Sequence, residues 1–301
     1  MECMEKIKSQ LLQAEIPFCC NEPLAHHTSF EIGGPATVFC NPITTDQLIQ
    51  TVKIVRSNAA RYYILGKGSN LLFSDKGFDG VVISTTNIAP EMQANGIEIV
   101  ANAGVSLKKV CELALQNELT GLEFAYGIPG SLGGAVYMNA GAYGGEIKDI
   151  LFSVEFLDND GNIRSLRADE LELGYRTSSF ARTGWCVLRA TLQLSKGDAA
   201  SIQSTMDELM QRRKDKQPLD LPSAGSAFKR PVGAFAGGLI DQCGLRGFRV
   251  GDAAISEKHC GFIVNLGHAS CEDVLELARQ VSEKVKEETG FVLEKEIRVV
   301  E

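Results

Sequence analysis

The sequence predicts an α+β protein of two domains, and three observations lead to this fold class. Runs with strand character alternate with runs of helical spacing over the first two thirds of the chain. Two glycine-rich loops lie among these runs, and from Asp198 onward long helical patterns appear. The 301 residues, of which 44% are hydrophobic and 23% charged, are enough for two domains with a substantial core.

The larger domain is expected over residues 1–196. An amphipathic helix opens the chain, and residues 45–57 place apolar side chains in helical spacing behind threonines that can act as N-caps. Another helix is expected from about residue 106 to residue 116, and an Asp-Gly pair predicts a turn at residues 158–161. Strands are expected at residues 36–40, 62–65, 80–84, 97–101, 147–157 and 185–194.

The smaller α+β domain is expected over residues 197–301. Helical spacing covers residues 199–216 and 270–289, and the second of these helices has a charged outer face. A proline-containing break follows the first helix at residues 217–224, and strand-like residues 291–300 close the domain.

The longer glycine-rich segment is GIPGSLGGAVYMNAGAYGG, nineteen residues from Gly127 to Gly145 with seven glycines and no charge. Glycine lets a ligand approach main-chain N–H groups directly, so this density indicates a cofactor held against backbone. A shorter loop, LGKGSNLL, follows a strand-like run, as phosphate-binding loops often do. Tight turns in a β-rich domain are the alternative for either loop, but they seldom need so many glycines.

Neither loop matches the common nucleotide signatures. Leu71 occupies the position where G-x-G-x-x-G requires its third glycine, and no G-x-x-x-x-G-K-[ST] sequence occurs. These absences disfavour a dinucleotide-binding Rossmann unit and a Walker-type NTPase.

Charge and cysteine usage limit the possible partners and compartments. The net charge of −8 argues against a nucleic-acid partner, whose phosphates attract basic proteins. The opening residues lack the apolar core of a signal peptide, and no long uninterrupted apolar stretch occurs, so we expect a cytoplasmic protein that does not cross a membrane. The nine cysteines lack metal-ligand spacing and suit a reducing compartment, so they are interpreted as mostly buried apolar residues, without a metal site.

Positive charge is concentrated between residues 211 and 249. The cluster at residues 211–216 can be explained by the C-terminal end of a helix, which favours cations. Residues 228–231, with Arg246 and Arg249, lack this explanation and could bind an anionic small molecule.

Six motifs, in this order, resemble the UDP-N-acetylenolpyruvoylglucosamine reductase family, often called MurB, over nearly the full length of the chain. Together they are far more specific than a GxGSN loop alone. They are HTSFEIGGPA (residues 27–36), LGKGSNLL (65–72), GIPGSLGGAVYMNAGAYGGE (127–146), ELGYRTSSF (172–180), SAGSAFKRP (223–231) and LEKEIRVV (293–300).

This resemblance implies an FAD-binding domain of the vanillyl-alcohol-oxidase type, followed by a substrate-binding domain to whose active site the C-terminal strand contributes. It also implies that NADPH reduces non-covalently bound FAD and that the hydride then reduces the enolpyruvyl double bond of a UDP-sugar, giving UDP-N-acetylmuramate for peptidoglycan. The enzyme would thereby serve cell wall biogenesis, cell shape and cell division. The chain is similar to the shorter members, which lack an inserted block with a tyrosine that closes over substrate, so we assign no such tyrosine.

The resemblance also implies which residues bind the cofactor. Main-chain N–H groups of the GKGSN loop would hold the pyrophosphate, the start of the longer segment would lie along the flavin and its phosphates, and two hydroxyls would assist. The expected cofactor-binding residues are Thr28, Ser29, Gly66, Lys67, Gly68, Ser69, Asn70, Gly130, Ser131, Gly133 and Gly134.

Three residues would be catalytic according to the same resemblance. Arg176 would stabilise negative charge on the substrate carboxylate, although alone it would be interpreted as a structural ion-pair residue. Ser226 would donate the proton, with Lys229 available to stabilise the alkoxide, although alone it would be interpreted as a turn serine. Glu296 would be buried and protonated, or would act through a water, because an ionised carboxylate would repel the intermediate.

Lys229, Arg230 and His259 are candidates for binding the nucleotide part of the substrate, because a diphosphate needs cationic or hydrogen-bonding partners. A lone histidine is nevertheless more often structural. Two other interpretations are an FAD-dependent oxidase of the same flavin fold and a non-catalytic flavin- or nucleotide-binding module. The motifs around Ser226 and Glu296 argue against the oxidase, and the presence of all three catalytic candidates argues against the module. We expect the enzyme to act as a monomer.

Overall fold

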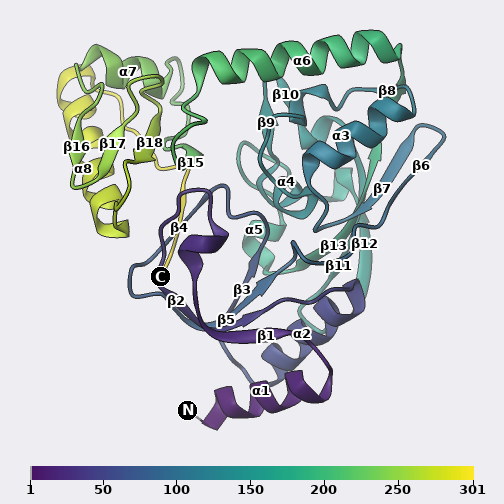
Figure 1. Ribbon diagram of the computed structural model, residues 1–301. Coiled ribbons are helices and arrows are strands. Elements are labelled where there is room, and N and C mark those ends of the chain that lie inside the picture. Colours follow the sequence, from purple (N-terminus) through teal and green to yellow (C-terminus); the bar gives the residue numbers. More distant parts are fainter. Residues whose placement is uncertain (1) are drawn as a thin grey trace. The chain divides into compact units, whose positions relative to one another are not determined.

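The computed structural model describes residues 2–301 and confirms an α+β fold (Figure 1). The chain forms two compact units. The first unit holds the described residues up to Cys19, together with Val38–Lys67 and Gly80–Arg213. The second unit holds Cys20–Thr37, Gly68–Asp79 and Lys214–Glu301. No helix among residues 2–301 has the length and apolar character that crossing a membrane would require.

The N-terminal part of the first unit is a strand–helix–strand arrangement. Helix α2 (Thr45–Ser57) begins after Thr44, whose side chain accepts a hydrogen bond from the N–H of Gln47. Strand β3 (Tyr62–Leu65) follows and pairs in parallel with β5 (Phe78–Ser84). Helix α1 (Glu2–Gln13) packs against α2. Their apolar faces share one cluster, which includes Ile7, Leu11, Leu48, Val52, Val55, Val81 and Ile83.

The rest of the first unit is built on a five-stranded antiparallel sheet. Its strands lie in the order β12-β11-β13-β7-β6 and are β6 (Met92–Asn95), β7 (Glu98–Asn102), β11 (Leu151–Leu157), β12 (Ile163–Arg167) and β13 (Cys186–Gln193).

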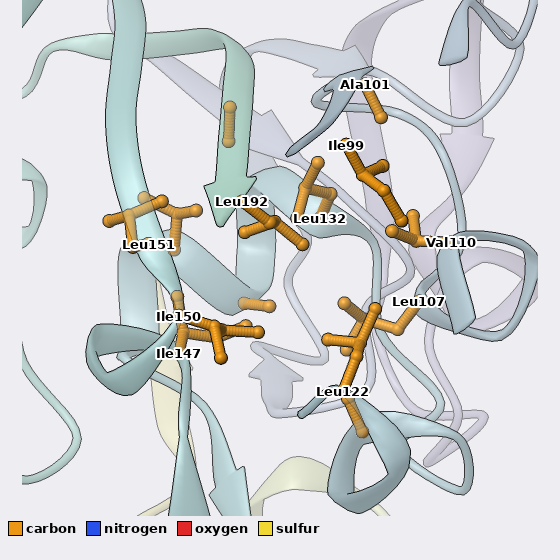
Figure 2. Packing of buried hydrophobic residues seen from close by; sticks show 14 of the residues in the cluster. Ile99, Ala101, Leu107, Val110, Leu122, Leu132, Ile147, Ile150, Leu151 and Leu192 are labelled. Carbon is orange, nitrogen blue, oxygen red and sulfur yellow. The ribbon is translucent and has the colours of Figure 1, made fainter. Parts of the chain in front are cut away.

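Helices α3 (Leu107–Gln116) and α4 (Leu132–Met138) pack against this sheet. Figure 2 shows Ile99 and Leu192 of the sheet turned toward Leu107 and Leu132 of the helices, within one buried cluster. This core holds the glycine-rich segment that leads into α4.

Short elements connect these parts of the first unit. They are β8 (Leu119–Thr120), η2 (Glu123–Ala125), β9 (Gly141–Ala142), β10 (Gly145–Glu146), η3 (Ile147–Asp149), η4 (Ala168–Glu170), α5 (Phe180–Thr183), β14 (Ser195–Lys196) and α6 (Ala199–Lys216), of which α6 ends in the second unit.

Two sequence-based expectations for this sheet were wrong in detail. The strand expected from residue 147 begins at Leu151, because Glu146 and Asp149 cap each other's main chain around the single turn η3. Strands β6 and β12 were not anticipated. Both are partly exposed, and β6 (MQAN) has no β-branched residue, so neither gives a strong strand signal.

The second unit contains a four-stranded antiparallel sheet in the order β15-β18-β17-β16. Helix α8 (Cys271–Thr289) packs against β16, β17 and α7. The other elements of the unit are β15 (Ser223–Ser226), α7 (Ala236–Gln242), β16 (Arg249–Val250), β17 (Ala253–Ile255), β18 (Phe262–Asn265), η1 (Leu24–His27), β4 (Leu71–Phe73) and β19 (Arg298–Val300).

Segments that are distant in sequence are joined inside this second unit. Strand β19 pairs in parallel with β4. The carboxylate of Asp75 accepts hydrogen bonds from the N–H groups of Cys271 and Glu272, at 2.8 and 3.2 Å, and so caps the start of α8. The expected strand over residues 291–300 forms only as β19, preceded by an isolated bridge between Phe228 and Lys295. Strands β1 (Phe18–Pro23), β2 (Pro35–Cys40) and β5 each continue from one unit into the other.

Candidate active site

The two glycine-rich loops meet in the first unit. Strand β3 ends at Leu65, and Gly66 follows it directly. A Cβ atom at Gly66 would lie 2.5 Å from Oγ of Ser131. Ser131 is buried and caps α4, where its Oγ accepts a hydrogen bond from the N–H of Gly134. The absence of a side chain at Gly66 therefore lets the first loop lie directly against the start of α4.

The first loop has main-chain donors that the protein itself does not use. Among residues 2–301, the N–H groups of Gly66, Lys67, Gly68 and Ser69 have no hydrogen-bond acceptor. Gly68 has a left-handed backbone, with φ 61°. Such a conformation allows successive N–H groups, here those of Gly68 and Ser69 in the second unit, to point at one anion such as a phosphate.

The start of α4 is different, because its glycines serve close packing. The N–H of Gly133 donates to the carbonyl oxygen of Ala103 at 2.9 Å, and the N–H of Gly130 donates to that of Ile128 at 2.8 Å. A Cβ atom at Gly133 would lie 2.7 Å from the Cβ of Ala103. What Gly130 and Gly133 can offer a ligand is therefore a surface without side chains, rather than unused N–H groups.

In the second unit, Thr28 and Ser29 lie beside Gly68. The N–H of Ser29 donates to the carbonyl oxygen of Gly68 at 3.3 Å. The hydroxyl of Ser29 donates to the carbonyl oxygen of Ser223 at 2.7 Å, and that of Thr28 donates to the carbonyl oxygen of Ile32 at 3.2 Å. Both hydroxyl hydrogens are thus engaged, and the oxygens can still accept hydrogen bonds.

Replacing Gly68 with Ala should reduce the FAD retained by the purified protein. A Cβ atom there would lie 2.1 Å from the carbonyl oxygen of His27, and the positive φ adds strain. Gly96→Ala is a matched control, because φ is 64° and nothing lies within 4 Å of a Cβ at that position. The control should lose about 1 kcal/mol of unfolding free energy and keep its flavin. Flavin absorbance per polypeptide and thermal unfolding would be measured; equal flavin content in both variants would contradict the prediction.

Arg176 lies in the first unit, in a turn beside the longer glycine-rich segment. Gly174 and Thr177 close this turn with two main-chain hydrogen bonds of 3.0 and 3.3 Å. Arg176 has a left-handed backbone, with φ 56°. Its Nη2 donates to the carbonyl oxygen of Gly141 at 3.1 Å, and its guanidinium carbon lies 5.0 Å from the ring centre of Tyr175. These contacts hold a planar, charged donor group beside the segment, which suits recognition of a carboxylate.

A second charged group lies near the Arg176 turn. Oε2 of Glu146 lies 2.7 Å from Nζ of Lys148. The hydrogen bond from Lys148 lowers the pKa of Glu146 most, and the amide of Asn139 and the charge of Arg176 lower it further. Glu146 therefore adds negative charge close to Arg176, and Lys148 offsets part of it.

Ser226 and Glu296 come together in the second unit. Strand β15 ends at Ser226, and the carbonyl oxygen of the next residue, Ala227, accepts a hydrogen bond of 2.9 Å from the N–H of Glu296. Nδ2 of Asn70 donates to the carbonyl oxygen of Glu296 at 3.3 Å, and the main-chain carbonyl oxygen of Asn70 accepts from the N–H of Arg298 at 3.0 Å. Ser226 and Glu296 are both half-buried, so Glu296 is less enclosed than we expected.

The three candidates for binding the nucleotide differ in their surroundings. Lys229 is half-buried, and its Nζ lies 3.1 Å from Oε2 of the exposed Glu294. Arg230 is exposed, with its guanidinium carbon 3.9 Å from the ring centre of Phe235. Nδ1 of His259 accepts the N–H of Gly261 at 3.1 Å.

Burial lowers the pKa of His259. Its imidazole therefore favours the neutral state and could offer a ligand its Nε2–H, rather than a positive charge.

Arg213 is a candidate that the sequence did not single out. Its Nε and Nη1 are buried without a hydrogen-bond partner among residues 2–301, and burial lowers its pKa. The side chain fills the space that a Cβ at Gly127 would need, at 3.0 Å from its Cδ. Arg212 instead pairs with Glu208, one turn earlier on α6, at 2.6 Å. The helix-end explanation thus suits Arg212. Four residues before Arg213 the sequence has Leu209 instead of an acidic residue, and this absence of an ion-pair partner on the helix distinguishes Arg213 from Arg212.

Within the described part of the chain, no group of three or more His, Cys, Asp or Glu side chains is placed to hold a metal ion. All nine cysteines are free thiols. Five of them, Cys40, Cys111, Cys186, Cys260 and Cys271, are buried.

Comparison with known proteins first identifies the class. Residues 36–167 match the FAD binding domain family, so the chain is a flavoprotein of the vanillyl-alcohol-oxidase type. A glucooligosaccharide oxidase from Acremonium strictum shares this fold at 13% identity, with a TM-score of 0.50 over 96% of this chain and 60% of that one. At that identity the likeness concerns the fold alone.

More similar proteins then define the family. Residues 217–300 match the C-terminal domain of UDP-N-acetylenolpyruvoylglucosamine reductase. The reductase of Caldanaerobacter subterraneus subsp. tengcongensis is 47% identical over 297 residues, covering 99% of this chain and 97% of that protein. The crystal structure of the reductase (MurB) from Thermus caldophilus has a TM-score of 0.79 at 39% identity, covering 95% of this chain and 99% of that one. The chain belongs to the UDP-N-acetylenolpyruvoylglucosamine reductase family.

Proposed function

We propose that the protein uses NADPH and FAD to reduce the enolpyruvyl double bond of UDP-N-acetylenolpyruvoylglucosamine, giving UDP-N-acetylmuramate for peptidoglycan. The observation that carries this proposal is the similarity to the Caldanaerobacter reductase over 99% of the chain. FAD, when bound, would take hydride from NADPH and supply it to the terminal vinyl carbon of the substrate.

The first glycine loop would hold the cofactor. Its unused N–H groups at Gly66–Ser69 would suit the diphosphate of FAD, and the glycines at the start of α4, Gly130, Gly133 and Gly134, would let the flavin approach the main chain. We place FAD binding in residues 1–196 and substrate binding in residues 197–301, as the sequence predicts.

Each catalytic candidate has a role that suits its chemistry. Arg176 would bind the substrate carboxylate and stabilise the charge that builds on it. Ser226 would protonate the carbon that bears this carboxylate, and Lys229 would stabilise the alkoxide left behind. Glu296 would hold a proton near the same carbon or act through a water.

Cationic residues would bind the phosphates of the substrate. Lys229 and Arg230 are the cationic candidates for this role, and the neutral His259 would donate a hydrogen bond instead of a charge. Arg213, in the first unit, is a separate candidate for binding an anion, because an anion would compensate its buried guanidinium. We further propose a cytoplasmic monomer with small-molecule ligands and no nucleic-acid partner, in keeping with the net charge of −8.

A single absorption experiment, with successive additions, can test the cofactor, the hydride donor and the substrate. The purified protein should show a flavin absorption spectrum, NADPH should bleach it, and the enolpyruvyl UDP-sugar should restore it without oxygen. A colourless preparation that takes up no added FAD would overturn the proposed function, and so would reduced flavin that the UDP-sugar cannot reoxidise.

The bound flavin should dissociate completely when the protein is denatured. His26 and His27 raise the question of a covalent link, because some relatives of this fold attach FAD through histidine. Nε2 of His27 lies 2.8 Å from Oε1 of Glu22, an interaction that occupies one of the two ring nitrogens through which a flavin link could form. After acid precipitation, all flavin absorbance should be in the supernatant. Colour remaining in the precipitated polypeptide would contradict this prediction.

A further inference from the structure

Asn139 is a buried polar residue with an unusual backbone. It follows the last residue of α4, its relative exposure is 0%, and its φ is 42°, in the left-handed region. Asparagine tolerates this conformation better than most residues, so its presence could reflect helix capping alone.

The side chain of Asn139, however, forms hydrogen bonds with three residues from two other segments of the first unit. Its Nδ2 donates to the carbonyl oxygen of Gly174 at 3.0 Å and to Oε2 of Glu146 at 3.1 Å. Its Oδ1 accepts the N–H of Lys148 at 2.9 Å. A buried amide satisfied on both ends fixes its partners relative to one another, because losing any bond leaves a polar group unpaired.

One of these partners belongs to the turn that carries Arg176. Gly174 and Thr177 close that turn, and Arg176 between them is held in the left-handed conformation. A non-glycine residue in this region costs on the order of 1 kcal/mol or more and keeps the conformation only where its surroundings enforce it. The bond from Asn139 to Gly174 is such an enforcing contact, and the bond from Arg176 Nη2 to Gly141 is a second one.

We propose that Asn139 is a positioning residue for Arg176, locking the turn of residues 174–177 onto the glycine-rich segment so that the guanidinium is pre-oriented for the substrate carboxylate. This inference rests on the proposed function, in which Arg176 binds that carboxylate. The energetic logic is preorganisation: an arginine already held in place loses less freedom when it binds its anion.

Two substitutions separate this role from simple helix capping. Asn139→Gly keeps the left-handed backbone without strain but removes the amide. Asn139→Asp keeps the size, the tolerance of positive φ and the acceptor toward Lys148, but places a carboxylate oxygen against Glu146 and the Gly174 carbonyl. A capping role alone predicts mild effects for both. Glu118→Gly is the matched control, because Glu118 is exposed and also left-handed, with φ 55°.

The test uses the FAD-loaded enzyme and two readouts. Hydrogen–deuterium exchange of a peptide covering residues 172–180 reports on the turn, and stopped-flow absorbance follows each half-reaction. In Asn139→Gly and Asn139→Asp we expect the amides of Gly174 and Thr177 to exchange at least about tenfold faster, because the turn loses its anchor. Reoxidation by the enolpyruvyl substrate should slow by at least about tenfold, with flavin reduction by NADPH and the control variant unchanged.

The two readouts distinguish the possible failures. Wild-type exchange in the Asn139 variants would overturn the positioning role, whatever the reoxidation rate. Faster exchange with wild-type reoxidation would overturn the proposed role of Arg176, and this inference with it. If Asn139→Gly does not fold, Asn139→Asp provides both readouts alone.

Discussion

Ser226→Ala should still lose its flavin colour when NADPH is added and should then fail to regain it with the enolpyruvyl substrate. Only the second half-reaction needs a proton at the carbon bearing the carboxylate. Loss of a positioned proton donor typically costs on the order of 10²- to 10⁴-fold, so reoxidation should slow by about that factor.

The structure makes this substitution a clean test. Ser226 ends β15, where it pairs with Phe262 through the main chain, and alanine keeps that pairing. Ser223 is a half-buried serine at the other end of the same strand, and its carbonyl oxygen accepts the hydroxyl of Ser29. Ser223→Ala keeps that carbonyl and should behave like wild type. Near-wild-type turnover in Ser226→Ala would show that Ser226 is not the donor.

Local signals in the sequence were sufficient for many elements. The helices α2 and α3 were predicted within one residue, because threonine and serine caps precede clear apolar periodicity. The hairpin formed by β6 and β7 was not predicted. Its turn has a left-handed glycine, Gly96, after an asparagine, which is a typical hairpin signal. Its missed strand β6 has alternate half-buried positions without strong strand formers.

The features of the fold that could not be predicted are contacts between segments that lie far apart in the sequence. Nothing near Leu71 indicates that β4 pairs with the C-terminal strand β19, and nothing near Asp75 indicates that it caps α8. The same limit applies to the site. The sequence motifs nominated Ser226 and Glu296, but only the folded chain shows that the main chain of Glu296 lies against Ala227. Likewise, the sequence alone does not indicate a role for Asn139 within the glycine-rich motif, because its hydrogen bond to the carbonyl oxygen of Gly174 joins segments that are distant in the chain.

Arg176→Lys should be almost as harmful as Arg176→Ala, although lysine keeps the positive charge. The proposed role requires two parallel N–H donors for the two oxygens of a carboxylate, and a single ammonium cannot reproduce that geometry. Removing one preorganised donor to a developing anion typically costs about 10²- to 10³-fold. Reoxidation of reduced flavin by the substrate should slow by about this factor in both variants, while reduction by NADPH stays near the wild-type rate.

The surroundings of Arg176 strengthen this expectation. Its Nη2 already donates to the carbonyl oxygen of Gly141, so the fork is oriented by the protein before any anion arrives. Lysine has its three N–H donors on one flexible nitrogen, so it cannot present two parallel donors to a carboxylate while also bonding to this carbonyl. Arg182 provides the control, because its side chain is exposed and pairs with the exposed Glu172, and such a surface ion pair should contribute little. Arg182→Lys should therefore react like wild type, and preserved reoxidation in Arg176→Lys would rule out a bidentate role for Arg176.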